Sequence, residues 1–101
     1  MTRDSASFDA ALTRIRELFA DHRQMPDALL YSVELEACTH NATRTAAAAG
    51  IPFVAACAEF GRAATESFPD DRLAAIRVGR TMIRWAATAY QAPSPLERAS
   101  G

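Results

Sequence analysis

The segment DDRLAAIRVGRTMIRWAATAYQ, residues 70–91, decides the fold of this 101-residue chain. Wound as a helix, it places Arg77, Arg80 and Arg84 on one narrow stripe between two apolar arcs. One arc comprises Leu73, Ile76, Ile83, Ala87 and Tyr90, and the other comprises Val78, Met82, Trp85 and Ala89. A surface helix needs only about 100° of apolar face. We therefore expect this helix to be covered from more than one direction.

The preceding sequence predicts three more helices joined by short connections. We expect the four helices at about residues 8–23, 26–49, 53–67 and 71–91. Pro26 suits the first turn of the second helix, and Gly50 is placed to end it in the left-handed conformation. Asp70 is the expected N-cap of the fourth helix. Residues 1–92 therefore read as one helical domain, followed by a flexible tail at 93–101.

Apolar spacing predicts which faces of the first two helices are buried. The expected inner face of the first helix is Phe8, Ala11, Leu12, Ile15, Leu18 and Phe19. The main stripe of the second helix is Tyr31, Leu35, Cys38, Ala42, Ala46 and Ala49. A second, mixed stripe runs through Leu29, Val33, Glu36, His40 and Ala47. Because this mixed stripe is too polar for a core and too apolar for a fully solvated face, we interpret it as a partner-facing side.

Short connections favour antiparallel neighbours, so the expected fold is all-α, a compact antiparallel four-helix bundle. A bundle helix needs one inward stripe, and the second apolar arc of the 71–91 helix therefore predicts a homodimer that associates through this helix. Met82, Trp85 and the arginines are residue types enriched at interfaces. The alternative is that this helix lies centrally and the first helix covers its second arc within the monomer.

Composition excludes several classes of function. The formal net charge is -1, which provides no basic field for nucleic acid, and the absence of lysine excludes Schiff-base and P-loop chemistry. No apolar run approaches the ~20 residues of a membrane span, and no signal peptide is apparent. We expect a cytoplasmic protein with neither nucleic-acid nor membrane partners. The arginine-only, alanine-rich composition is typical of a GC-rich, bacterial-like genome.

The cysteines and histidines do not form a catalytic or metal-binding pattern. Cys38 and Cys57 lack metal or redox spacing, and helical geometry staggers them by roughly 9 Å, too far for a disulfide. We interpret both as small buried apolar residues. Glu36 and His40 are four residues apart and share a face, but two ligands do not make a metal site. We therefore predict no cofactor, no metal and no catalytic machinery, although enzymatic activity stays an open question.

The stripe formed by Arg77, Arg80 and Arg84 is the most suggestive charged feature of the chain. Three guanidinium groups in a row can bind phosphate, nucleic acid or an acidic protein surface. They can equally pair with carboxylates of the other helices or of a second copy. Overall acidity and the lack of interleaved aromatic residues weigh against nucleic acid.

One stretch of the sequence, about residues 37–64, resembles a known family through His40, Gly50, Val54 and Cys57. These positions resemble histidine phosphotransfer domains, which are four-helix bundles with an exposed phospho-accepting histidine in mid-helix. The resemblance implies that His40 is the phospho-acceptor. The family motif has lysine three residues and glycine four residues after the histidine, whereas this chain has Thr43 and Arg44.

We predict a non-enzymatic protein–protein interaction module, an adaptor, regulator or inhibitor, that acts through a helical face. The candidate binding residues are Arg77, Arg80, Arg84, Met82, Trp85, Glu36 and His40. One alternative is a phosphorelay domain that uses His40. The other is a small-molecule-binding bundle with a cavity lined by Phe53, Phe60, Phe68 and Trp85.

Overall fold

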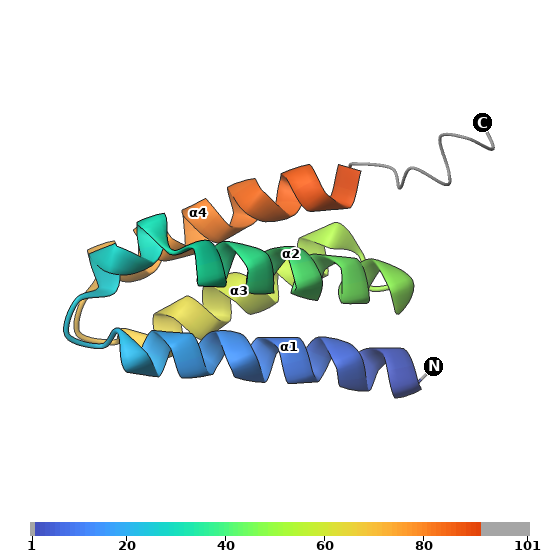
Figure 1. The fold of residues 1–101 in the computed structure, drawn as a ribbon, viewed down its shortest axis with the longest axis horizontal. Coiled ribbons are helices and arrows are strands. Elements are labelled where there is room, and N and C mark those ends of the chain that lie inside the picture. The colour runs from blue at the N-terminus through green and yellow to red at the C-terminus, as the bar shows by residue number, and fades with distance from the viewer. Residues whose placement is uncertain (1, 92–101) are drawn as a thin grey trace.

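The described part of the chain is built from helices alone (Figure 1). The computed structural model describes residues 2–91, with side chains for residues 6–90. Within this range it has five helices and no strand: α1 (Thr2–Asp21), the 3-10 helix η1 (Pro26–Tyr31), α2 (Val33–Ala48), α3 (Phe53–Ser67) and α4 (Arg72–Gln91). The predicted all-α class is confirmed. The tail predicted at 93–101 lies outside the described residues.

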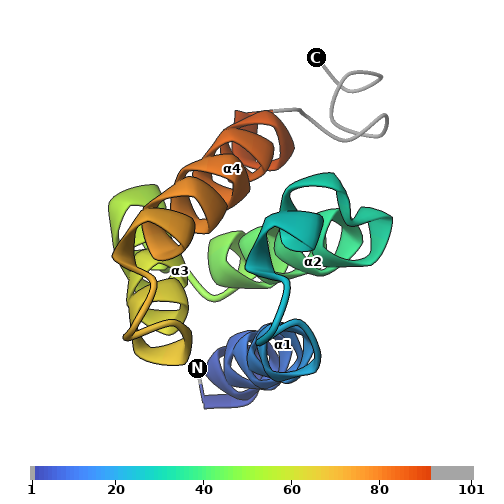
Figure 2. The ribbon, with the colours of Figure 1, turned by 90° about the vertical axis from the view of Figure 1, so that its left-hand side faces the viewer.

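The most extensive helix contacts are those of α1 with α2 and of α3 with α4, whereas α2 and α3, which also follow one another, make few contacts. α1 packs along α2, and α3 packs along α4, while α2–α4 and α1–α3 contacts join the two pairs. Figure 2 shows α4 at the edge of the molecule, with α2 and α3 beside it and α1 across the molecule from it. The alternative in which the first helix covers the fourth is therefore not observed in residues 2–91.

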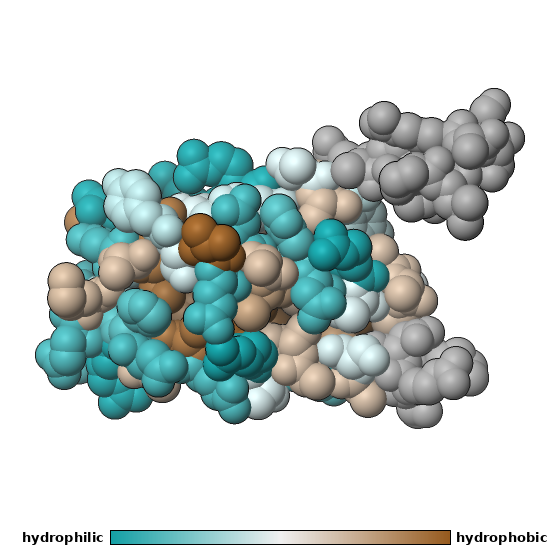
Figure 3. All heavy atoms as spheres, in the orientation of Figure 1, coloured by the Kyte–Doolittle hydropathy of each residue, from teal (hydrophilic) through white to brown (hydrophobic). Residues whose placement is uncertain are grey.

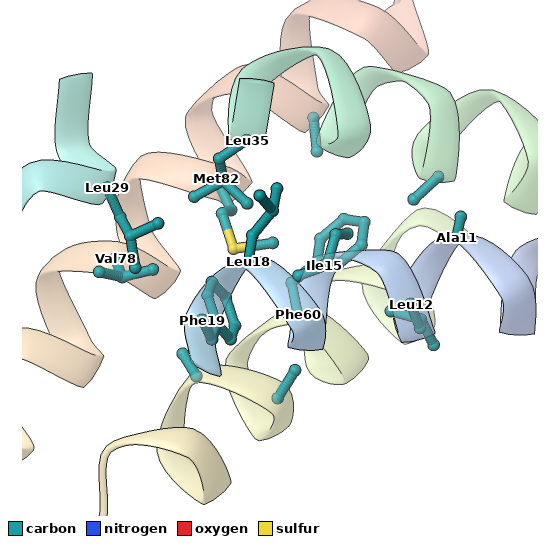
Figure 4. Packing of buried hydrophobic residues seen from close by; sticks show 14 of the residues in the cluster. Ala11, Leu12, Ile15, Leu18, Phe19, Leu29, Leu35, Phe60, Val78 and Met82 are labelled. Atoms are coloured by element: carbon teal, nitrogen blue, oxygen red, sulfur yellow. The ribbon is translucent and has the colours of Figure 1, made fainter. Parts of the chain in front are cut away.

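The core contains the whole predicted inner face of α1, since all six of its apolar residues are buried. Two aromatic pairs join α1 to α3 and the turn after it. The ring centroids of Phe8 and Phe60 are 6.4 Å apart, and those of Phe19 and Phe68 are 5.5 Å apart. Figure 4 shows Leu29 of η1 beside Val78 of α4 in the same cluster. Each large side chain buried in this way stabilises the fold by about 1.5–3 kcal/mol.

The second predicted helix, 26–49, is wrong as a single helix. The chain forms η1 and α2 instead, because Ser32 adopts an extended conformation and its Oγ accepts the Leu35 N–H at 3.0 Å. Ser32 is thus the N-cap of α2. The break changes the helical phase, so Leu29 is fully buried and Tyr31, expected inside, is 86% exposed.

Gly50 ends α2 as predicted, with φ at 76°. The N–H of Ile51 donates to the Ala46 carbonyl at 2.9 Å, and the N–H of Gly50 donates to the Ala47 carbonyl at 3.1 Å. These two bonds form a Schellman motif, which satisfies carbonyl groups at the end of the helix. Glycine adopts the required left-handed backbone without a Cβ clash.

The remaining helix bounds differ from prediction mainly at helix starts. α1 begins at Thr2, six residues before the expected start, whereas α3 spans the predicted 53–67. α4 begins at Arg72, and its N-cap is Asp71 rather than Asp70. Asp71 Oδ1 accepts the Ala74 N–H at 3.1 Å. The reason is a turn in which the Asp71 N–H donates to the Phe68 carbonyl, so that Asp70 belongs to the turn and Asp71 follows it.

This N-cap assignment predicts an asymmetry between two adjacent aspartates. Asp71→Ala removes the acceptor for the α4 amide group and should lower the free energy of unfolding by about 1 kcal/mol. Asp70→Ala should change it much less, because the two carboxylates share the same charge and exposure but only Asp71 caps the helix. Urea unfolding of both variants measures the difference. Equal losses would contradict the assignment.

Candidate functional site

The outer side of α4 carries large apolar side chains that are exposed, although the ring of Tyr90 also packs against Phe53 of α3. Leu73 is 59% exposed, Ile76 45%, Ile83 36% and Tyr90 39%. These residues are half of the large apolar side chains that are exposed within residues 6–90. We define the α4 outer face as these four residues together with Arg72, Arg77, Arg80 and Arg84, which are also exposed. The apolar arc of α4 that we expected a second helix to bury is therefore exposed to solvent.

The other arc of α4 faces the interior of the molecule. Met82 is fully buried among the core side chains, so it is not available to a partner as predicted. Trp85 is half-buried and packs against the same core cluster. The physical reason is close packing with α3: a Cβ added at Gly79 would lie 3.8 Å from the Cα of Gly61. The two helix backbones meet there, which turns Met82 inward.

Small residues were the sequence signal for this inner face. Ala75, Gly79 and Ala86 share one side of α4 and are all buried. Small side chains at helical spacing allow two helices to approach closely, whereas large exposed ones do not. The positions of these small residues predict that Ile76 and Ile83, rather than Met82 and Trp85, face a partner.

The four arginines of the α4 outer face have no ion pair with any described residue. The only guanidinium hydrogen bond of this group within residues 6–90 is from Arg84, which donates to Thr81 Oγ1 at 3.4 Å. Three arginines of α1 and α3 differ, whereas Arg44 of α2 also has no ion pair among the described residues. Arg16 pairs with Glu66 at 3.0 Å, Arg62 pairs with Glu59 at 3.2 Å, and Arg14 pairs with Glu17 and Glu34. The expected pairing of the α4 stripe with carboxylates of helices one to three is not observed in this part of the chain.

A shallow pocket of about 430 Å³ lies between η1 and α4, next to the outer face. It is lined by Leu30, Tyr31, Thr81, Arg84 and Trp85. Arg84 borders the pocket and also belongs to the outer face. Tyr31 contributes an exposed ring because of the helix break at Ser32. Of the predicted binding residues, the structure therefore brings Arg84 and Trp85 together in one pocket.

The face formed by α1 and α2 has a different character. Figure 3 shows hydrophilic and weakly apolar residues interspersed over this side, with strongly hydrophobic atoms only in small areas. On α2, Glu36 and His40 are half-buried. Within the described side chains, no three His, Cys, Asp or Glu residues lie close enough to hold a metal ion.

His40 presents a buried ring nitrogen. Its Nε2 is sealed from solvent and has no hydrogen-bond partner among the described residues. A phosphoryl group needs an accessible imidazole nitrogen, so this geometry weighs against the phosphorelay alternative at Nε2. A buried polar atom without a partner also costs stability.

The buried nitrogen leads to a prediction for stability. His40→Leu replaces an unsatisfied polar atom with apolar surface, so the free energy of unfolding should stay the same or rise by up to about 1 kcal/mol. Thermal and urea unfolding measure this, with Thr39→Val as a matched control. Thr39 is fully buried and its Oγ1 donates to the Leu35 carbonyl at 2.8 Å, so its loss should not stabilise. A large loss on His40→Leu would mean that His40 has a polar partner.

Cys38 and Cys57 are free and half-buried. Burial raises the pKa of the Cys57 thiol, and burial is also the main effect that raises the pKa of Cys38, where nearby Arg14 opposes it. Because the thiolate is the nucleophile, a raised pKa makes both cysteines poorly reactive near neutral pH.

Alkylation kinetics test this description of the thiols. At pH 8, iodoacetamide should react with both cysteines severalfold more slowly than with the same chain unfolded in urea. The rate in the folded chain should keep rising above the ordinary thiol pKa, because the folded thiols lose their protons at higher pH. Cys38→Ser and Cys57→Ser assign the two rates. A fast reaction of the folded chain at pH 7 would refute the prediction.

The aromatic residues proposed for a ligand cavity do not share one. Phe60 is fully buried against Phe8, and Phe68 packs against Phe19. Phe53 packs against Tyr90, with ring centroids 5.1 Å apart, and Trp85 lines the pocket beside η1. Each ring therefore has a separate environment, and among the described side chains the four rings do not line one common cavity.

No helix in the described range has the length and apolarity that crossing a membrane requires. Comparisons with protein-family models, with curated proteins and with solved structures found no match to this chain. The candidate site therefore rests on its geometry and chemistry.

Proposed function

We propose that this chain is a non-enzymatic protein–protein interaction module, built as a compact antiparallel four-helix bundle, that acts through the α4 outer face. The observation that carries the proposal is the combination, on one helix, of exposed apolar side chains with four arginines that have no ion pair within residues 6–90. The cytoplasm is the proposed location, since the free cysteines suit a reducing compartment.

The spacing of the exposed apolar residues supports a binding surface. Single exposed apolar residues are common on proteins and need no explanation, but a continuous patch marks an interaction site. Ile76, Ile83 and Tyr90 follow one another at intervals of seven residues, and Leu73 precedes Ile76 by three. In a helix this spacing forms one stripe. Covering it with a partner would stabilise a complex by about 25 cal/mol for each Å² of apolar surface removed from water.

The homodimer predicted from the sequence would have to use this same face. Its expected anchors, Met82 and Trp85, point into the core and the η1 pocket. The apolar anchors that remain on α4 are Leu73, Ile76, Ile83 and Tyr90. A second copy and an unrelated protein are thus competing occupants of one surface.

Site-specific photo-crosslinking tests the proposed function. A photoreactive amino acid at position 83, in the centre of the α4 outer face, should give discrete protein adducts in living cells of the source organism. The matched control is position 37, an exposed site on α2. The same adducts from both positions, or none from position 83, would refute the proposal. An adduct of twice 10.9 kDa would identify a second copy.

A further inference from the structure

We infer that the occupant of the α4 outer face is an acidic amphipathic helix of another protein. The inference rests on the proposed function and adds the chemistry of the partner. It is carried by two features of α4: the spacing of its exposed apolar residues and the separation of positive from negative charge along the chain.

The exposed stripe of α4 follows a helix-pairing register. Its positions are 73, 76, 80, 83, 87 and 90, which alternate by three and four residues. This is the spacing at which one helix packs its side chains between those of another. Four of the six positions hold exposed large apolar residues, position 87 holds a half-buried alanine, and position 80 holds Arg80. The stripe therefore suits a helix that has apolar residues along its contact face and one polar residue opposite Arg80.

The positive charge of α4 favours a partner that carries carboxylates. α4 contains four arginines and no acidic residue from Arg72 to Gln91, although the whole chain has a net charge of -1. Four carboxylates of α1, α2 and α3 pair with arginines of α1 and α3, and none of the described carboxylates pairs with an arginine of α4. A helix with Asp or Glu beside its apolar seam would give the α4 arginines charge-assisted, bidentate hydrogen bonds. Opposite potentials would also speed the encounter and select the partner.

A second copy of the chain is a poorer occupant, because it would double the four arginines without adding a carboxylate from α4. In a parallel pairing, Arg80 would face Arg80 of the second copy. In an antiparallel pairing Arg80 could face Ile83 of the second copy, but Arg77 and Arg84 of the two copies would then flank the same side of the seam. Each arrangement brings like charges together, which is destabilising.

An anionic lipid surface also fits less well. Arg80 lies in the middle of the apolar stripe, between Ile76 and Ile83. In a membrane the phosphate groups and the acyl chains lie at different depths. Arg80 would need the phosphate groups at the same place where the two isoleucines need acyl chains. A helix can place a carboxylate at that one position and apolar residues on both sides of it.

A pair of synthetic peptides tests the inference. The probe is a fluorescent three-heptad peptide with Ile and Leu in its seam and Glu at the flanking positions; the control peptide has Lys in place of Glu. Fluorescence anisotropy should show that the full-length protein binds the acidic peptide at least tenfold more tightly than the basic one. Rising salt should weaken binding of the acidic peptide, because ions screen exposed charges.

Charge reversal on α4 should reverse this preference. The variant Arg77→Glu, Arg80→Glu, Arg84→Glu should bind the basic peptide more tightly than the acidic one. Its helical content should be unchanged in circular dichroism, since these arginines are exposed and have no ion pair in the described range. Arg44→Glu is the matched control: Arg44 is an exposed arginine of α2, and its reversal should leave the preference for the acidic peptide unchanged.

Three results would overturn the inference. The first is equal binding of both peptides, or a preference that charge reversal does not change. The second is binding to vesicles that contain phosphatidylserine without binding to the acidic peptide. The third is a stable dimer in light scattering that Ile83→Glu dissociates. If position 83 still crosslinks to a protein in cells, these results refute only the acidic helix and leave the proposed function standing.

Discussion

The contact between α3 and α4 at Gly61 and Gly79 determines the orientation of the last helix. Two helix backbones approach closely only where both lack bulky side chains, and a Cβ added at Gly79 would lie in van der Waals contact with the Cα of Gly61, at 3.8 Å. Because a helix is rigid, the side that meets α3 also decides which side meets solvent. Val78 and Met82 enter the core, and Ile76 and Ile83 turn outward. The candidate site is thus a consequence of packing on the opposite side of the same helix.

Electrostatics reinforces this division. The ion pair of Arg14 with Glu34 joins α1 to α2, and the pair of Arg16 with Glu66 joins α1 to α3. All of these groups are well exposed to solvent, so each pair adds little to stability. Four carboxylates of the first three helices pair with arginines of α1 and α3, and no arginine of α4 has an ion pair within residues 6–90.

Periodicity predicted the helices and part of their faces. The inner face of α1 and the bounds of α3 follow from apolar spacing, and Gly50 follows from the rarity of left-handed backbone in other residues. Apolar spacing does not predict which of several possible side-chain caps begins a helix. Ser32 competes with continuation of one long helix, and two adjacent aspartates offer the same capping oxygen until the turn before them is known.

The candidate site could be predicted only in part from the sequence, for a similar reason. The sequence shows two apolar arcs on α4 and an arginine stripe between them, but it does not show which arc the other helices cover. That choice depends on how α3 packs against α4 near Gly61 and Gly79, a tertiary property that apolar spacing alone does not contain. His40 is a parallel case, because burial of one ring nitrogen depends on neighbouring helices and not on helical phase.

The pairing of α1 with α2 and of α3 with α4 has a consequence for how the chain folds. In each pair the two helices are neighbours in the sequence, so the entropy lost in closing the connecting loop is small. Proteins dominated by such local contacts fold in microseconds to milliseconds. The α1–α2 hairpin and the α3–α4 hairpin can each form independently. Packing of α2 on α4 and of α1 on α3 then completes the fold. We therefore expect the chain to fold fast.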